Sequence, residues 1–294
     1  MDWHLFGKSD LTPQDVVNFR SRINLMDIGA ACIAETPVYK VLLDEDLAFL
    51  NAFEGDLRQV DAIKNTYGES VRVFPQFLSD GTVKTLYVAS ESSGMTSLLK
   101  PDARALKFFN GFEQFGLIER EVAVHTTRLD DVPNIGSIDF LKMDIQGAEL
   151  DVLKHGIKTL EKCVAIQLET SFVCLYENQP TFGDVDVWMR SQGFTPHCYL
   201  DVKRWSIAPT IRDNNFRQPF NQLLEADMVY IKDPLKPELL DAEQLKKLAL
   251  ISHYCLASFD LAVHAIMELV SRGAVRKDAR EKYLGCLAKN KGGK

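Results

Sequence analysis

Short apolar runs of strand length alternate with helical patterns along most of the chain. Alternation of this kind predicts an α/β fold on a parallel sheet, because a crossover helix joins each strand to the next. Runs that are apolar on both faces, such as residues 138–145 and 164–170, are typical of central strands that helices cover on each side. The seven runs lie at residues 23–28, 47–53, 70–79, 138–145, 164–170, 194–200 and 226–232.

Capping residues predict where several helices begin and end. Thr36 followed by Pro37 predicts an N-cap and a first-turn proline, and Asp56 predicts the N-cap of a second helix. Gly68 and Gly193 predict helix C-termini, because glycine readily adopts the left-handed conformation that ends a helix.

Two segments depart from the alternation. Asp80-Gly81 lies between two strand-like runs and predicts a hairpin rather than a crossover. Ser90–Gly116 is polar and then aromatic, which suits either a loop bordering a site or an ordinary surface insertion. We expect this loop and the loop Arg204–Phe220 to determine substrate specificity.

The C-terminal segment shows no strand pattern. We therefore predict two domains, a catalytic one over residues 1–235 and a helical appendage with a basic tail over residues 236–294. Asp260, His264 and Glu268 recur every four residues and form one stripe of an otherwise apolar helix. Charges at that period exclude a membrane span, for which about twenty apolar residues are needed. Such a helix should be buried against the sheet domain or against a second copy of the chain, which makes a homodimer through this region a hypothesis. His264 should be a partnered structural residue.

Composition and charge exclude several classes of protein. With 294 residues, 46% hydrophobic, the chain is neither disordered nor a disulfide-rich scaffold. The net charge of -7 argues against nucleic acid as a partner, because phosphates are bound by clustered Lys and Arg. The six Cys include no C-x-x-C pair, so we expect reduced thiols and no zinc site. No apolar run of signal-peptide length opens the chain, so we expect a cytoplasmic protein.

Polar residues follow most of the apolar runs. In a doubly wound sheet, ligands bind at the carboxyl ends of the strands, where the strand order reverses. The candidate site residues are therefore those at the run ends, namely Asp27, Gly29, Ala30, Glu54, Ser79, Asp80, Asp144, Glu149 and Glu169.

The first two strand ends predict a nucleoside site. Gly29 admits a close ligand, and Glu54 some 25 residues on can accept hydrogen bonds from ribose hydroxyls. Both NAD and S-adenosylmethionine fit that pattern, but the two later glycines of the dinucleotide fingerprint are missing. Asp27 and Asp144 would repel a pyrophosphate and attract the ammonium and sulfonium of S-adenosylmethionine. The residues therefore favour S-adenosylmethionine, with an NAD-dependent oxidoreductase as an alternative.

One segment carries a family resemblance. Thr127–Gly156 resembles the signature of the FkbM-type methyltransferases, which runs T-L-D, a spacer and then D-x-L-K-I-D-V-E-G-A-E. The stretches MDIGA, AFEGD and FLSDGTVKTLYV resemble that family's V-D-V-G-A, A-F-E-P and S-D-x-x-G motifs, so the resemblance covers about residues 24–232. Three positions depart from it: Ala31-Cys32-Ile33 lacks the second glycine, Gly55 replaces a proline, and Gln146 replaces an acid.

The resemblance implies a class I methyltransferase fold, with a mostly parallel seven-stranded sheet whose last strand is antiparallel. It also implies methyl transfer from S-adenosylmethionine to a hydroxyl of a sugar, glycan or related natural product. Carried over residue by residue, Glu54 would meet the ribose, Asp80 beside Ser79 the adenine side, and Asp144 the sulfonium. The methionine end would be lined by Asp27, Gly29 and Ala30.

Transfer to an alcohol requires in-line positioning and a group that removes the hydroxyl proton. The candidate bases are Asp144, Glu149, Glu169 and His125, although Glu149 also fits a first-turn acid favoured by the helix dipole. A divalent cation held by Asp144 and Glu169 is an alternative, without the His or further carboxylates usual in such sites. Lys142, in a buried strand, should pair with an acid. A non-catalytic relative that uses its helical appendage for interactions is a second functional hypothesis.

Overall fold

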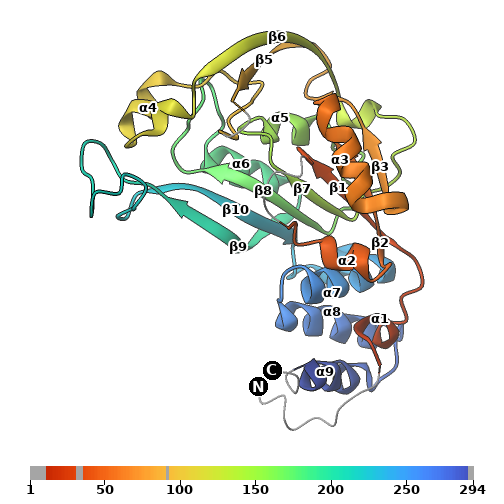
Figure 1. Cartoon of the computed structure of the whole chain (residues 1–294). Coiled ribbons are helices and arrows are strands. Elements are labelled where there is room, and N and C mark those ends of the chain that lie inside the picture. Colours follow the sequence, from red (N-terminus) through yellow and green to blue (C-terminus); the bar gives the residue numbers. More distant parts are fainter. Residues whose placement is uncertain (1–10, 31–35, 91–92, 291–294) are drawn as a thin grey trace. The chain divides into compact units, whose positions relative to one another are not determined.

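The computed structural model describes residues 11–30, 36–90 and 93–290. The chain divides into two compact units, each made of separate stretches of sequence (Figure 1). The sheet unit comprises residues 26–33 and 50–232, and the helical unit comprises residues 1–25, 34–49 and 233–294.

A seven-stranded sheet has the order β3-β2-β1-β7-β8-β10-β9. Neighbours β2 and β3 are parallel, as are β7 and β8, whereas β10 runs antiparallel to both β8 and β9. This arrangement confirms the expected α/β fold, mostly parallel with its last strand antiparallel. The strands are β1 (Ile23–Ile28), β2 (Ala48–Phe53), β3 (Val71–Phe74), β7 (Phe140–Met143), β8 (Ala165–Ser171), β9 (Phe194–Arg204) and β10 (Leu223–Lys232).

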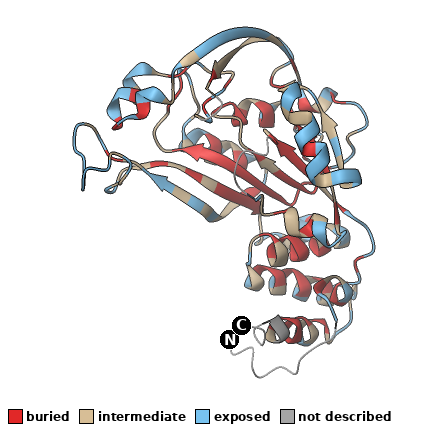
Figure 2. Ribbon diagram, viewed as in Figure 1, coloured by how far each residue is buried: buried red, intermediate tan, exposed pale blue. Residues whose placement is uncertain are grey.

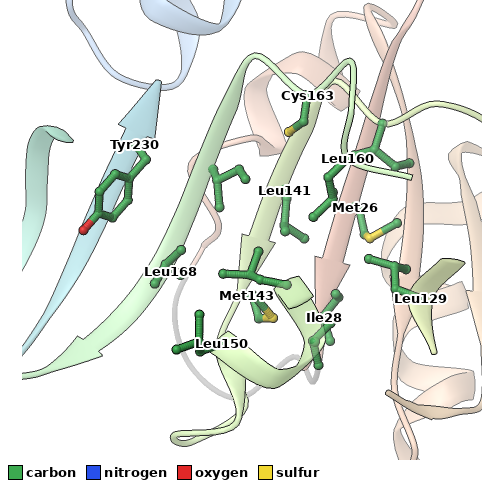
Figure 3. Packing of buried hydrophobic residues seen from close by; sticks show 14 of the residues in the cluster. Met26, Ile28, Leu129, Leu141, Met143, Leu150, Leu160, Cys163, Leu168 and Tyr230 are labelled. Carbon is green, nitrogen blue, oxygen red and sulfur yellow. The ribbon is translucent and has the colours of Figure 1, made fainter. Parts of the chain in front are cut away.

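One face of the central strands packs into a large apolar core (Figure 3). Every second residue of these strands points into it, because side chains alternate across a strand. Met26, Leu141 and Leu168 come from three different strands and are fully buried there. Helices α5 (Glu149–Lys154) and α6 (Phe182–Ser191) cover this face with their buried apolar residues.

Three of the predicted helix ends are confirmed. The Asp56 side chain accepts a hydrogen bond from the Arg58 amide at the start of α3 (Leu57–Tyr67). Gly68 ends α3 with φ +58°, and Gly193 follows α6 with φ +76°.

The helix start predicted at Thr36 and Pro37 is wrong. Helix α2 (Lys40–Asp44) has Tyr39 at its N-cap. The Pro37 carbonyl instead accepts a hydrogen bond from the Lys40 amide at 3.0 Å, so this proline belongs to a turn that precedes the helix.

A second, three-stranded sheet replaces the predicted hairpin. Its strands are β4 (Phe77–Leu78), β5 (Val83–Ala89) and β6 (Ile118–Thr127), in the order β4-β6-β5. The two strands that flank Asp80-Gly81 therefore both pair with β6 and not with each other. The turn between them is bound to β6 as well, since the Thr126 hydroxyl accepts a hydrogen bond from the Gly81 amide and donates one to the Thr82 carbonyl. Residues of β6 are largely exposed, as Figure 2 shows. Helix α4 (Ala103–Phe108) lies in the loop between β5 and β6.

The helical unit brings the two ends of the described chain together. Helix α1 (Pro13–Val16) contacts both α7 (Ala242–Tyr254) and α9 (Ala279–Asn290), and α8 (Phe259–Ser271) packs against α7. The Tyr254 hydroxyl donates a hydrogen bond to Gln14 at 2.8 Å. The helical pattern predicted after Pro237 is confirmed, with a break at residues 255–258 between α7 and α8.

The charged stripe of α8 includes a partnered histidine, as expected. The Nε2 atom of His264 lies 3.0 Å from the carbonyl oxygen of Pro234. The opposite side of α8 is buried, with Ala262, Ala265 and Ile266 fully enclosed. None of the helices formed by the described residues combines the length and apolar character that crossing a bilayer requires.

Candidate active site

The turn after β1 is held against both neighbouring strands. The amides of Gly29 and Ala30 donate hydrogen bonds to the Phe53 carbonyl at 3.0 and 3.2 Å, and the Asp144 amide donates to the Ile28 carbonyl at 3.0 Å. Gly29 has φ +81°, a conformation that glycine adopts readily. The predicted ligand ends of three strands therefore meet at one edge of the sheet. Residues 31–35, which include the departure at Ala31-Cys32-Ile33, lie outside the described residues.

Asp27 and Lys142 form an ion pair beneath this turn. Their Oδ1 and Nζ atoms are 3.4 Å apart, and the Asp27 side chain is 4% exposed. Burial lowers the pKa of Lys142, but the charges of Asp27 and Asp144 outweigh it and leave that pKa above its usual value. Lys142 therefore stays cationic and has the acidic partner that its place in a buried strand predicts.

Glu54 follows β2 directly beside the Gly29 turn. Its Oε1 atom accepts a hydrogen bond from the Asp56 amide at 2.8 Å, and the side chain is only partly buried. The neighbouring Gly55 packs against the ring of Phe77, and a Cβ atom at position 55 would lie closer than 3.0 Å to that ring. The glycine that replaces the family's proline at position 55 therefore leaves room for the Phe77 ring.

Ser79 and Asp80 are held by their surroundings at the start of the second sheet. The hydroxyl of Ser79, which is buried, hydrogen-bonds to the Asp151 carboxylate. Asp80 forms an ion pair with Lys84 at 2.8 Å. Hydrogen bonds from Lys84 and Thr82 hold the pKa of the Asp80 carboxyl well below its usual range. Asp80 is therefore ionised throughout the physiological pH range.

Gln146 bridges two candidate carboxylates at the ends of β7 and β8. Its Nε2 atom donates to Oδ1 of Asp144 at 2.8 Å and to Oε2 of Glu169 at 3.0 Å. Its Oε1 atom accepts from the Tyr176 hydroxyl at 3.1 Å, and burial raises the pKa of Tyr176, so that this hydroxyl remains a donor. The amide that replaces the family's acid thus joins Asp144 to Glu169.

Glu169 is buried and lies among charged residues that are themselves half-buried or exposed. Its Oε1 atom is 3.2 Å from Nζ of Lys203, which also contacts Glu225 at 2.8 Å. Burial and the neighbouring charge of Asp144 raise the pKa of Glu169 well above its usual value. Asp227 pairs with Glu169 in the register of β10 on β8, and burial raises its pKa as well. The sequence did not reveal Lys203 or Asp227, because only the strand pairing brings them to Glu169.

Glu149 has a different environment from the other carboxylates. Its Oε1 atom accepts hydrogen bonds from the amides of Ile145 and Gly147 at 3.0 and 3.1 Å, so the side chain holds the turn before α5. The residue is 5% exposed, and burial raises the pKa of Glu149 to about 7. These contacts favour its interpretation as a first-turn structural acid.

His125 lies apart from these groups. It is exposed in β6, where it pairs with Val83. Within the part of the chain that the structure describes, no hydrogen bond or ion pair joins it to Asp144 or Glu169.

The donor set does not fit a metal ion. In the described ranges, no group of three or more His, Cys, Asp and Glu is arranged to hold one. The Nε2 atom of Gln146 points at both Asp144 and Glu169, so a hydrogen-bond donor occupies the position that a shared cation would take.

The two loops expected to choose the substrate pack against each other. The Asn110 side chain donates to the Thr210 carbonyl at 2.6 Å and to the Ser206 hydroxyl at 3.0 Å. In return, the indole N–H of Trp205 donates to the Asn110 carbonyl at 2.9 Å. These three hydrogen bonds join the two loops into one structural element.

The strand order, with β10 antiparallel to both of its neighbours, is that of the class I methyltransferase fold. Residues 49–196, just over half of the chain, match the family model described as the Methyltransferase FkbM domain. The chain therefore belongs to the FkbM methyltransferase family. This membership confirms the resemblance that led us to expect a class I methyltransferase fold.

One curated relative is the 2-O-methyltransferase NoeI of Sinorhizobium fredii (strain NBRC 101917 / NGR234). It is 31% identical over 162 residues, which are 53% of this chain and 66% of the relative, just under two thirds of its length.

Two of the similar solved structures are methyltransferases by name. The precorrin-6y C5,15-methyltransferase from Geobacter metallireducens GS-15 has a TM-score of 0.34 at 10% identity, covering 79% of this chain and 97% of that one. The magnesium protoporphyrin IX methyltransferase from Synechocystis PCC 6803, with bound SAM, has a TM-score of 0.35 at 9% identity, covering 75% and 77%.

Proposed function

We propose that this protein is an S-adenosylmethionine-dependent O-methyltransferase that acts on a hydroxyl of a sugar, glycan or related natural product. The observation that carries the proposal is the Gly29 turn, which hydrogen bonds hold beside Glu54 and against Asp144. Family membership supports methyl transfer, and the 2-O-methyltransferase relative supports an oxygen acceptor.

The carboxylates at the strand ends suit this cofactor, because they accept hydrogen bonds from ribose hydroxyls and attract a cationic ligand. We assign Glu54 to the ribose, Asp80 beside Ser79 to the adenine side, and Asp144 to the reacting end. When bound, S-adenosylmethionine supplies an electrophilic methyl group. The residues assigned to its methionine end are Asp27, Gly29 and Ala30.

Among the candidate bases, we assign proton removal to Glu169. Burial raises the pKa of Glu169, which makes its carboxylate a stronger base than that of an exposed glutamate. The acceptor proton would move to Oε2, the oxygen that faces the Gln146 amide, while Lys203 holds Oε1. Asp144 is the second candidate, because the same amide joins it to Glu169.

Calorimetry with S-adenosylmethionine and its demethylated product tests cofactor binding. We expect binding to both, weakened by Asp27→Ala and by Glu54→Ala. Incubation with labelled cofactor and fractionated cell glycans, followed by mass detection, then tests transfer. The absence of heat with either ligand would refute the proposal. Cofactor binding without transfer to any acceptor would instead support a non-catalytic interaction protein, which the missing second glycine at Ala31-Cys32-Ile33 favours.

The wider organisation of the protein stays a set of predictions. We propose a methyltransferase domain over residues 1–235, an appendage over residues 236–294 that forms a homodimer, and a cytoplasmic location. Light scattering of the purified chain tests the dimer, with a monomer at micromolar concentration as the contradicting result.

A further inference from the structure

An open groove of about 470 Å³ lies in the sheet unit, at the loop that follows β9. Two of its apolar residues reach solvent, since Ile207 is 40% and Phe220 47% exposed. Hydrophobic side chains of this size are normally buried, so their grouping in one groove points to a ligand. The lining residues are Trp205, Ile207, Thr210, Phe220, Asn221 and Gln222.

The groove is held in shape without a ligand. The indole of Trp205 packs edge-on against Phe112 with ring centroids 4.9 Å apart, and its N–H is bound to the Asn110 carbonyl. Asn110 in turn fixes Thr210 through that residue's carbonyl. Both substrate loops therefore contribute to a rigid wall, which lowers the entropic cost of binding.

The groove begins close in sequence to a residue that contacts the proposed base. Lys203, which contacts Glu169, lies two residues before Trp205, a spacing of about 7 Å in extended backbone. The Trp205 amide also donates to the Gln222 carbonyl at 3.1 Å, which extends the pairing of β9 with β10 into the groove. The groove therefore begins two residues after the lysine that contacts Glu169.

The residues that line the groove indicate the chemistry of the ligand. It combines apolar and aromatic surface with the Thr210 hydroxyl and the amides of Asn221 and Gln222, and none of its side chains is ionisable. A neutral sugar ring has an apolar C–H face that stacks on an aromatic ring and hydroxyls that bond to amides. An alkyl chain would leave the amides unused. The Arg212 guanidinium lies 5.7 Å from the centroid of the Phe220 ring, so an anionic ligand is the alternative that the binding test must exclude.

We propose that this groove is a second sugar subsite, which binds a saccharide unit of the acceptor other than the one that is methylated. The enzyme would then take oligosaccharides or glycosylated molecules in preference to free monosaccharides. This inference rests on the proposed function, because it assumes that the acceptor is a glycan.

Binding of defined sugars to the full chain tests the subsite. Chitotetraose, cellotetraose and maltotetraose are each titrated by calorimetry beside their monosaccharides and beside decanoate. We expect at least one tetrasaccharide to bind about tenfold more tightly than its monosaccharide, and Phe220→Ala to weaken that binding about tenfold. Val187→Ala, at a residue that is 71% exposed on α6, is the matched control and should leave binding unchanged.

Three results would overturn the subsite: no binding of any tetrasaccharide, equal binding of tetrasaccharide and monosaccharide, or binding of decanoate that Phe220→Ala abolishes. Transfer assays separate this inference from the proposed function. Sugar binding that depends on Phe220, without methyl transfer, would retain the groove as a sugar-binding site but refute the function, and with it the role of the groove as an acceptor subsite. Methyl transfer to a glycan with a KM that Phe220→Ala leaves unchanged would retain the function and refute the subsite.

Discussion

Gly29 lies so close to Asp144 that a Cβ atom at position 29 would come within 3.0 Å of the Asp144 carbonyl oxygen. Real Cβ atoms essentially never approach a neighbour so closely. The turn after β1 and the end of β7 can therefore meet only if residue 29 lacks a side chain. Since these two strand ends carry the proposed cofactor site, the glycine serves backbone packing as well as ligand access.

We expect Gly29→Ala to abolish cofactor binding and to destabilise the protein by several kcal/mol, because backbone atoms cannot move aside. Gly136→Ala is the matched control: Gly136 also has a positive φ, +73°, but an added Cβ would meet nothing within 4 Å. It should cost only about 1 kcal/mol, the usual penalty for a left-handed alanine. Urea unfolding and calorimetry check both. Equal losses in the two variants would contradict the packing argument.

We expect Gln146→Glu to shift the pH dependence of kcat toward higher pH. A third carboxylate between Asp144 and Glu169 would raise the pKa of Glu169 further, because like charges disfavour ionisation. The base would then be deprotonated only at higher pH, so the pH profile of kcat should shift upward by about one unit. Gln114→Glu, at an exposed position, adds the same charge and should not shift it. An unchanged profile in Gln146→Glu would argue against Glu169 as the base.

Glu149→Gln should change how stability depends on pH. The folded protein holds the Glu149 proton up to about pH 7, whereas the unfolded chain releases it near 4.5. The free energy of unfolding therefore falls as pH rises between these values, by about 3 kcal/mol from this group. A glutamine keeps the acceptor for Ile145 and Gly147 but cannot ionise.

Urea unfolding at pH 5 and pH 8 measures this effect. We expect Glu149→Gln to match the parent protein at pH 5 and to exceed its stability at pH 8. Glu149→Ala, which removes the acceptor, should be less stable than Glu149→Gln at both pH values. A constant difference between parent and Glu149→Gln across this range would show that the carboxyl titrates normally.

Asn110→Ala should separate acceptor binding from cofactor binding. The variant leaves the Thr210 carbonyl and the Ser206 hydroxyl without their shared donor, so the two substrate loops should loosen. We expect faster amide hydrogen exchange at residues 206–210 and a KM for the acceptor about tenfold higher, with unchanged affinity for S-adenosylmethionine. Asn65→Ala, on the exposed side of α3, is the control. Protected amides in Asn110→Ala would refute the role of this side chain.

The sequence predicted those features that depend on local patterns. The apolar run at residues 23–28 coincides with β1, and Asp56 caps α3 as expected, because neighbouring residues decide both. Strand pairing between residues far apart in the sequence could not be predicted in this way. The strands flanking Asp80-Gly81 pair with β6, some 40 residues later, and no local signal shows that partner. Lys203 reaches Glu169 only through the register of β9, β10 and β8, which single-sequence patterns do not specify.

The helical unit joins residues from opposite ends of the described chain, since Gln14 and Tyr254 are 240 positions apart. A ribosome makes α1 early and the helices it packs on, α7 and α9, only after the whole sheet unit has been synthesised. During that interval α1 has none of its helical partners, and a helix of four residues does not persist alone in water. The helical unit can therefore be completed only after the whole sheet unit has been synthesised, although α1 is among the first elements made.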